Sequence, residues 1–218
     1  MTTSLPRSRD FEALTARYDA WFEEHESAYL SELEAVRRLL PPRGPFLGLE
    51  VGVGPGRFAA PLGIQVGVDP ALEALKLAKR RGVEAVRAVG ELLPFRDEAF
   101  DLVLLVVTLC FLSDPVAALR EAYRVLRPGG RLIVGIIDRE SELGRAYLRR
   151  KAEGRPFYRD AVFYTPREVM AMLEEAGFRV REVLQTLSRP PDELEEVEGP
   201  EEGCGRGAFV VVMAVKAS

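Results

Sequence analysis

The sequence has few of the residues that most often carry catalysis on their own. Its 218 residues include one histidine, His25, two cysteines, Cys110 and Cys204, and no asparagine. No Ser/His/Asp set and no metal-ligand cluster can be recognised, which argues against hydrolase and metalloenzyme classes and predicts no metal. The two cysteines lie in unlike surroundings, an apolar run and a Gly/Glu-rich loop, so we expect free thiols rather than a disulfide.

Long apolar runs and an excess of one charge are also missing. No run reaches the roughly 18 to 20 residues that a membrane span needs. Residues 1–7 lack the apolar core of a signal peptide, so we expect a cytoplasmic protein with no membrane association. The formal net charge is −4 and the arginines are scattered along the chain. A nucleic-acid partner is therefore not expected.

One stretch, residues 46–58, organises the rest of the chain. An apolar run ends at Glu50 and is followed by Gly52, Gly54 and Gly56 at alternate positions. This pattern predicts a buried strand, a tight turn and a helix that begins near Arg57. Glycine lets the backbone pass close to a bulky ligand with positive φ, and a helix N-terminus offers free N–H groups. The stretch therefore predicts a loop that binds a nucleotide-type ligand.

Two ligand classes use such a turn, and Glu50 favours one of them. The dinucleotide fingerprint G-x-G-x-x-G/A fails at Arg57 when it is read from Gly52, and it fits only weakly from Gly54. A carboxylate at the end of the strand suits a cationic or donor-rich ligand and would face a pyrophosphate unfavourably. An ordinary α/β crossover that binds nothing is the remaining alternative.

The run Glu50-Val51-Gly52-Val53-Gly54-Pro55-Gly56 resembles the first motif, [E/D]-x-G-x-G-x-G, of the class I S-adenosylmethionine (SAM) dependent methyltransferases. A second match is the apolar strand that ends at Asp69-Pro70, 19 residues after Glu50. The resemblance implies that Asp69 accepts hydrogen bonds from the ribose hydroxyls. An ionised carboxylate suits this role because it can only accept hydrogen bonds.

Residues 87–101 are similar to the run G-D-A-E-x-L-P-F-x-x-x-x-F-D of a subfamily, methyltransferase type 11, that includes the quinone-biosynthesis C-methyltransferases. The run Ala118 to Gly130 matches the subfamily pattern A-L-R-E-x-x-R-V-L-x-P-G-G. The aspartate that the family uses on the adenine amino group is replaced here by Val89. Glu91 and Leu92 are therefore candidates for the adenine pocket. The alternative is that Glu91 is a solvated loop acid.

The resemblance implies an α/β, Rossmann-like class I methyltransferase fold. We expect a seven-stranded, mostly parallel sheet with an antiparallel last strand, helices on both faces and an N-terminal helical cap. With 47% hydrophobic residues the chain suits one domain. We divide 1–218 into a helical cap (1–45), a SAM-binding core (46–137), an acceptor-binding insertion (138–165) and a C-terminal helix with the last strands (166–218).

Ten residues are candidates for contact with the cofactor. Tyr18 belongs to an aromatic stripe on the first predicted helix, a pattern that more often marks core, and Thr108 follows the predicted central strand. The full set is Glu50, Gly52, Gly54, Gly56, Asp69, Pro70, Glu91, Leu92, Thr108 and Tyr18.

The acceptor candidates are Trp21, Tyr147, Tyr158, Arg159 and Phe163. The last four lie in the predicted insertion, which is unusually aromatic for a connection and follows the strand next to the crevice. Packing under a long loop explains these aromatic residues equally well.

Together these features predict a SAM-dependent methyltransferase. It would move a methyl group to a small-molecule acceptor by direct in-line transfer and release S-adenosylhomocysteine. No catalytic residue can be assigned, because His25 reads as an exposed helix residue as readily as a base. The alternatives are a SAM-binding regulatory protein without turnover and an NAD-dependent oxidoreductase. A homo-oligomer is compatible with the sequence.

Overall fold

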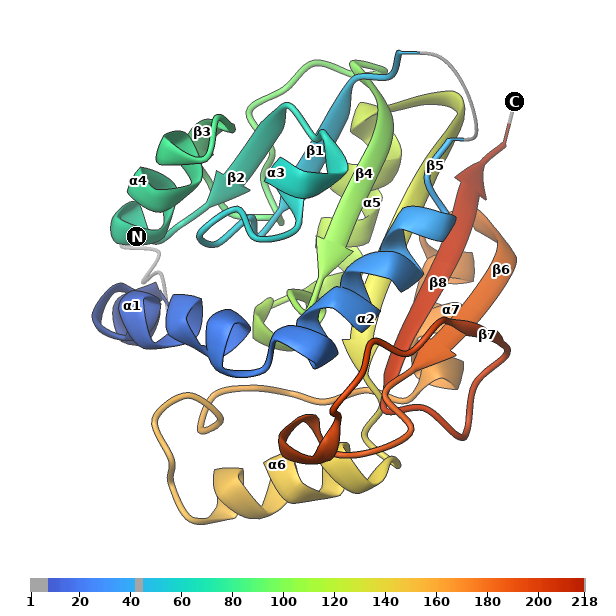
Figure 1. The fold of residues 1–218 in the computed structure, drawn as a ribbon. Helices are drawn as coiled ribbons and strands as arrows, with labels where there is room; N and C mark the ends of the chain where they lie inside the picture. The colour runs from blue at the N-terminus through green and yellow to red at the C-terminus, as the bar shows by residue number, and fades with distance from the viewer. Residues whose placement is uncertain (1–7, 42–44, 218) are drawn as a thin grey trace.

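A computed structural model describes residues 8–41 and 45–217, which form one sheet with helices on both faces (Figure 1). The strand order is β3-β2-β1-β4-β5-β8-β6-β7. The strands are β1 (Gly48–Val51), β2 (Val66–Asp69), β3 (Glu84–Arg87), β4 (Phe100–Val106), β5 (Leu126–Ile137), β6 (Phe178–Thr186), β7 (Glu201–Glu202) and β8 (Phe209–Lys216).

The first five strands are parallel, so their carboxyl ends meet at one edge of the sheet. The last strand, β8, is antiparallel and inserts between β5 and β6. This confirms the predicted Rossmann-like fold with an antiparallel last strand. The described chain adds one strand to the seven expected, because Glu201 and Glu202 in the acidic loop pair with the end of β6 as β7.

Apolar side chains fill both faces of the sheet. One face packs against residues of α1, α2 and α4, and the other against α5 and α7. Strand β4 is almost wholly buried because both of its faces are covered. The helices are α1 (Ser8–Glu24), α2 (Glu26–Arg38), α3 (Ala59–Leu62), α4 (Leu72–Arg80), α5 (Pro115–Val125), α6 (Glu142–Ala152) and α7 (Pro166–Glu175).

Two helix starts are capped by side chains of the local sequence. The Asp114 side chain accepts a hydrogen bond from the Ala117 N–H at the start of α5, directly before Pro115. Thr165 and Glu168 form a reciprocal capping box at the start of α7. The helix predicted near Arg57 is different, since α3 has only four residues and ends at Gly63 in the left-handed conformation.

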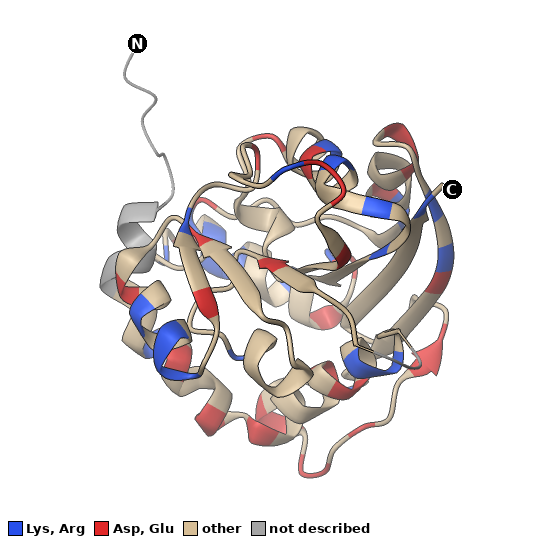
Figure 2. Ribbon diagram, turned by 90° about the horizontal axis from the view of Figure 1, so that it is seen from above, with Lys and Arg blue, Asp and Glu red and all other residues tan. Residues whose placement is uncertain are grey.

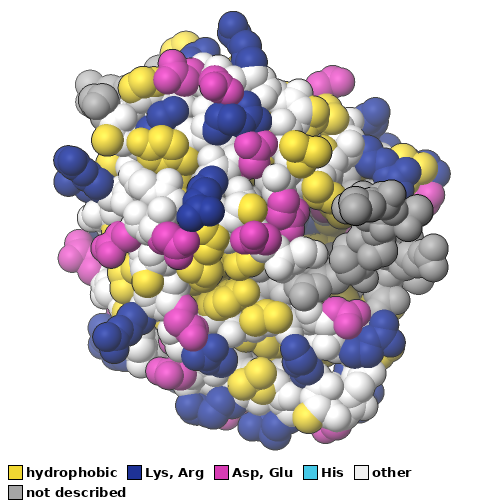
Figure 3. Space-filling model, turned by 180° about the vertical axis from the view of Figure 1, so that it is seen from behind, with side chains coloured by type: hydrophobic (Ala, Val, Ile, Leu, Met, Phe, Trp, Pro, Cys, Tyr) yellow, Lys and Arg dark blue, Asp and Glu magenta, His cyan; other side chains and the backbone are white. Residues whose placement is uncertain are grey.

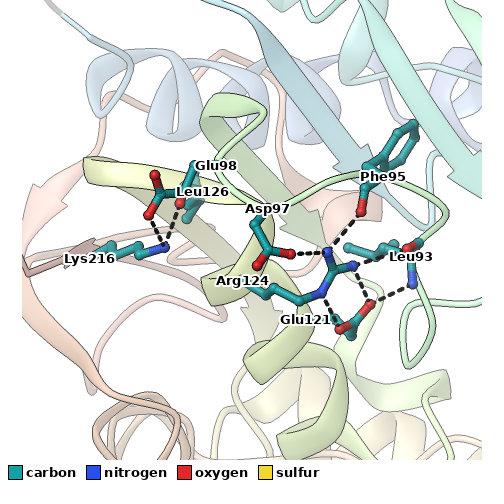
Figure 4. A network of polar contacts seen from close by, with 8 residues as sticks. All are labelled: Leu93, Phe95, Asp97, Glu98, Glu121, Arg124, Leu126 and Lys216. Atoms are coloured by element: carbon teal, nitrogen blue, oxygen red, sulfur yellow. Dashed lines mark hydrogen bonds and ion pairs between the residues drawn. The ribbon is translucent and has the colours of Figure 1, made fainter.

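Arg124 of α5 holds the loop that follows β3 (Figure 4). Its guanidinium makes two hydrogen bonds to Glu121 and donates to the carbonyl oxygens of Leu93 and Phe95 and to Asp97. The Leu93 N–H in turn donates to Glu121. A planar guanidinium can satisfy this fixed set of acceptors, whereas a lysine ammonium cannot. This loop carries residues 88–91 of the cleft described below, so Arg124 supports the cleft from outside.

Glu32 of α2 is an unusual part of the core. It is 3% exposed and lies on the buried face of α2 with Ala28 and Val36. Burial raises the pKa of this carboxyl group to about 8, because a low-dielectric interior disfavours the charged form. The protein therefore keeps a titratable acid where an apolar residue would cost less.

Replacing Arg124 by alanine should lower the free energy of unfolding by about 2–3 kcal/mol, because several hydrogen bonds to one charged group are lost together. The matched control is Arg120→Ala on the same helix, whose ion pair with Glu175 is exposed on both sides and should contribute under about 1 kcal/mol. Urea unfolding of both variants checks this. Equal destabilisation by the two changes would contradict the role of Arg124.

Replacing Glu32 by glutamine should stabilise the protein at high pH. The folded pKa of Glu32, about 8, lies above its ordinary value of 4.5, so the native state binds the proton more tightly and stability falls as pH rises between these values. Each pKa unit corresponds to about 1.4 kcal/mol. We therefore expect Glu32→Gln to gain up to about 5 kcal/mol at pH 8.5 and nothing at pH 4.5.

Urea unfolding at both pH values measures this gain, with exposed Glu34→Gln on the same helix as the control. A gain that does not depend on pH would show that Glu32 is not protonated in the native state.

Candidate functional site

A cleft opens where β1, β2 and β4 end. Its walls come from the turn after β1, the end of β2, the segment after β3 and the segment after β4. The lining residues are Tyr18, Val51, Gly52, Gly54, Asp69, Pro70, Ala88, Val89, Gly90, Glu91, Val106, Val107, Thr108, Phe111, Leu112 and Ser113. Crevices at the carboxyl ends of strands are where open α/β sheets bind ligands.

The glycine turn brings the backbone of β1 against the segment after β4. Gly52 has φ +72°, and a Cβ atom at this position would lie 2.3 Å from the side chain of Thr108. Thr108 is buried, and its hydroxyl donates to the carbonyl oxygen of Val106. Any larger residue at position 52 would push these two segments apart. Gly56 has a different role, since it lies against Ala78 of α4.

Glu50, at the floor of the turn, has an incompletely satisfied carboxyl group. It is 1% exposed, and its Oε2 atom has no hydrogen-bond partner in the part of the chain that the structure describes. Burial raises the pKa of this group well above its ordinary value, and the charge of Asp69 raises it further, while a hydrogen bond from the Ala59 backbone opposes the rise. A cationic or hydrogen-bond-donating ligand would satisfy this atom.

Asp69, at the end of β2, is fixed by two backbone hydrogen bonds. Oδ2 accepts from the Gly54 N–H at 2.9 Å, and Oδ1 accepts from the Ala71 N–H at 2.8 Å. The first bond ties the glycine turn to the neighbouring strand. Asp69 and Pro70 both line the cleft, beside the turn, as the sequence predicted from the position of the second strand.

The two candidates for the adenine pocket lie in different places. Glu91 lines the cleft, but its carboxyl group also accepts hydrogen bonds from the backbone N–H groups of Ser113 and Asp114. The side chain of Leu92 is 74% exposed. Val89 lines the cleft in the position where the family carries an aspartate. Contact of Glu91 and Leu92 with adenine stays a prediction.

Tyr18 closes the cleft from α1. Its ring stacks on Phe157 with the centroids 5.4 Å apart, and it meets Phe22 edge to face. Burial raises the pKa of its hydroxyl well above the ordinary value. The stack joins the N-terminal cap to the segment after α6, so two segments far apart in sequence meet over the cleft.

A second cleft adjoins the first and is lined mostly by aromatic and aliphatic side chains. The two clefts share Val107 and Phe111. Three acceptor candidates, Tyr147, Tyr158 and Phe163, line this second cleft. The remaining lining residues are Val107, Leu109, Cys110, Phe111, Ile136, Ile137, Phe157 and Tyr164.

Val107 and Phe157 are site residues that sequence reasoning missed. Val107 has φ +51°, which is strained for a β-branched residue and is typical of functional positions. Nothing in the local sequence predicts that conformation. Phe157 could have been found, because it belongs to the same aromatic segment as Tyr158 and Phe163.

The other candidates lie elsewhere. Trp21 stacks on His25, whose Nε2 atom lies 2.7 Å from Asp192 Oδ1. His25 is thus engaged by an exposed acid of the loop after β6, away from the lining residues of both clefts. Arg159 is exposed and pairs with Asp160 at 3.5 Å. Contact of Trp21 or Arg159 with an acceptor stays a prediction.

Seven of the ten cofactor candidates line the first cleft: Tyr18, Gly52, Gly54, Asp69, Pro70, Glu91 and Thr108. Glu50, Gly56 and Leu92 are not among the lining residues. Contact of these residues with a sulfonium nucleoside stays a prediction. Within residues 8–41 and 45–217, no group of three or more His, Cys, Asp or Glu side chains could hold a metal ion. None of the described helices is long and apolar enough to cross a membrane.

Comparison with known proteins gives consistent matches over most of the chain. A family model described as "Methyltransferase domain" matches residues 49–134. An uncharacterized protein of Methanocaldococcus jannaschii is 45% identical over 94% of this chain and 98% of its own length. A ubiquinone biosynthesis O-methyltransferase of Xylella fastidiosa is 28% identical over 81% of this chain and 80% of its own.

The structural comparison agrees with the sequence comparison. A solved structure from Thermotoga maritima, described as a SAM-dependent methyltransferase and possible histamine N-methyltransferase, is 48% identical to this chain. It superposes with a TM-score of 0.92 and covers 96% of this chain and 99% of that one. Given this match and the geometry of the first cleft, the chain belongs to the class I SAM-dependent methyltransferases of the type 11 family.

Proposed function

We propose that this protein transfers a methyl group from SAM in the first cleft to a small molecule in the second. The observation that carries the proposal is the shared wall: Val107 and Phe111 line both clefts, so two bound molecules would meet there. The aromatic and aliphatic lining of the second cleft supports a small and largely apolar acceptor. S-Adenosylhomocysteine would be the product that remains bound.

The residues of the chain would act mainly by binding the reactants, aligning them and excluding water from them. SAM supplies an activated methyl group on a sulfonium, which a nucleophile can displace directly. Glu50 would hold the amino group of the cofactor and Asp69 its ribose, which fixes the position of the reacting carbon. The aromatic walls exclude water, and alignment together with desolvation can supply several kcal/mol of the rate enhancement.

The distribution of charge supports a small acceptor. Figure 2 shows Lys and Arg interspersed with Asp and Glu over the ribbon. Figure 3 shows both signs mixed with hydrophobic side chains on the back face. A surface without a basic stripe offers little to nucleic acid. We further propose a cytoplasmic location. A homo-oligomer is compatible with the sequence, and light scattering would measure the oligomeric state.

The transfer is tested in two steps. Calorimetry with SAM, S-adenosylhomocysteine and NAD should show binding of the first two only. SAM carrying a tritiated methyl group should then label a low-molecular-weight compound in a cell extract. Tight SAM binding without any transfer would favour a regulatory protein, and binding of NAD alone would favour an oxidoreductase.

Replacing Glu50 by glutamine should weaken SAM binding at least tenfold while the fold is kept. The side-chain shape is conserved, but the amide cannot carry the negative charge that a cationic ligand would meet. Calorimetry measures the affinity, and thermal unfolding measures stability, which should not fall because a buried acid is removed. The control is Glu84→Gln, because the side chain of Glu84 on β3 is exposed. Unchanged SAM affinity in Glu50→Gln would contradict the role of Glu50.

Replacing Tyr18 by phenylalanine should weaken SAM binding about fivefold, since the stack on Phe157 remains while one buried hydroxyl is lost, a change of about 1 kcal/mol. Tyr123→Phe is the matched control, because that ring packs on Phe178 beneath α5. Calorimetry and turnover are measured for both variants. Wild-type affinity and turnover in Tyr18→Phe would remove Tyr18 from the site.

A further inference from the structure

Asp19 of α1 ties the N-terminal helix to the glycine turn of the first cleft, the cofactor cleft. Its Oδ1 atom accepts a hydrogen bond from Nε of Arg57 at 2.7 Å, and its Oδ2 atom accepts one from Nη2 of Arg81 at 2.9 Å. Arg57 also donates to the backbone carbonyl oxygen of Asp19. One carboxylate thus binds two guanidinium groups that come from different parts of the chain, and such charge-assisted hydrogen bonds are among the strong ones.

Both arginines are attached to the glycine turn. Arg57 directly follows the last glycine of the turn. Arg81, directly after α4, donates a second hydrogen bond to the carbonyl oxygen of Pro55 within the turn, at 2.8 Å. Asp19 therefore holds α1 against the turn at two points, at Arg57 directly and at Pro55 through Arg81.

The two ion pairs of Asp19 are partly shielded from water. The side chains of Asp19, Arg57 and Arg81 are 18%, 15% and 27% exposed. Burial raises the pKa of the Asp19 carboxyl group, but the hydrogen bonds from the two arginines outweigh burial, so the pKa lies below its ordinary value. Glu23, one turn further along α1, also pairs with Arg57, but its side chain is 74% exposed. Exposed pairs contribute little, whereas partly buried pairs are screened less by solvent and salt.

Tyr18, the neighbour of Asp19 on α1, lies over the glycine turn. It lines the cofactor cleft, and a Cβ atom on Gly54 would lie 3.7 Å from its ring. Successive residues of an α-helix have a fixed angular spacing, so a carboxylate held toward the turn also fixes the direction of the ring beside it. Asp19 itself is not among the lining residues of either cleft. An effect of Asp19 on a bound ligand would therefore pass through Tyr18.

We propose that Asp19 is a positioning residue for the cofactor. Its hydrogen bonds with Arg57 and Arg81 hold Tyr18 over the glycine turn, and this arrangement sets how long a bound nucleoside stays in the cleft. The inference rests on the proposed function, because it takes SAM and S-adenosylhomocysteine as the ligands of this cleft. Without the carboxylate, α1 can move away from the turn, so the ligand should leave faster. Affinity differences between variants of one site lie mostly in the dissociation rate.

The dissociation rate of S-adenosylhomocysteine, measured by surface plasmon resonance on the immobilised full chain, tests the proposal. Asp19→Asn keeps the size of the side chain and removes its charge. It should release the ligand about tenfold faster than the wild type, because two charge-assisted hydrogen bonds are weakened together. The matched control is Glu23→Gln, on the same helix and against the same Arg57, which should stay within about twofold of the wild type. Equal rates in Asp19→Asn and the wild type would overturn the inference.

Trp21 reports the position of α1 independently of ligand release. It is the single tryptophan of the chain and lies on α1 between Asp19 and Glu23. In the complex with S-adenosylhomocysteine, acrylamide should quench its fluorescence about twofold more strongly in Asp19→Asn than in the wild type, because a helix with fewer contacts opens more often. Glu23→Gln should be quenched like the wild type. A lower unfolding temperature of Asp19→Asn with unchanged quenching and release would show that Asp19 only stabilises the fold.

A double-mutant cycle tests whether the effect passes through Tyr18. The variant that combines Tyr18→Ala with Asp19→Asn should release S-adenosylhomocysteine at the rate of Tyr18→Ala alone, because the second change removes an interaction that acts through the missing ring. Effects that multiply would overturn the inference. Arg81→Gln provides a cycle that keeps the ring. It should speed release as well, and Asp19→Asn should then add less than it does in the wild type.

The failure of this inference can be told apart from the failure of the proposed function. If the wild type binds neither SAM nor S-adenosylhomocysteine, or transfers no methyl group, the proposed function fails. If both ligands bind and a methyl group is transferred, but Asp19→Asn retains S-adenosylhomocysteine like the wild type, only the role of Asp19 is overturned.

Discussion

The hydrogen bond from the Gly54 N–H to Asp69 ties the cofactor cleft together. It joins the turn after β1 to the end of β2, two segments that the parallel sheet already brings side by side. Because Asp69 also accepts from the Ala71 N–H, its carboxylate is held between two strand ends. The glycine turn can then pass close to Thr108, with Glu50 beneath it and one of its oxygen atoms unsatisfied.

Buried acids are the recurring feature of this site. Glu50 and Asp69 lie at the ends of neighbouring strands, and Glu32 lies on the helix that covers the same face of the sheet. Burial raises the pKa of Glu50 and of Glu32, because a low-dielectric interior disfavours the charged form.

The second cleft shows how distant segments of the chain cooperate. Tyr18 of α1 stacks on Phe157 after α6, and Phe157 and Phe111 meet edge to face. These ring contacts join α1, the segment after β4 and the aromatic segment after α6, whose backbones can be followed in Figure 1. Strain at Val107, at the boundary of both clefts, is held in place by this packing and by its N–H bond to the Gly135 carbonyl oxygen.

The sequence by itself determined the features that depend on neighbouring residues. The glycine turn, the acids at strand ends and the caps at Asp114 and Thr165 each follow from chemistry within a few positions, and all of them occur in the structure. The parallel order of the core strands followed from the family resemblance. The length of α3 was not predicted, because the helix ends at Gly63, whose left-handed conformation the sequence left open.

Tertiary structure decided which side chains reach the clefts. Trp21 and Tyr18 lie three residues apart on one helix, yet Tyr18 lines the cofactor cleft while Trp21 stacks on His25. Leu92 is directed to solvent although its neighbour Glu91 lines the cleft. The spacing of Ala28, Glu32 and Val36 places Glu32 on the buried face of α2, whereas the charge of its side chain predicts exposure. Such outcomes depend on how whole elements pack against one another, and a local sequence pattern does not encode those distances and directions.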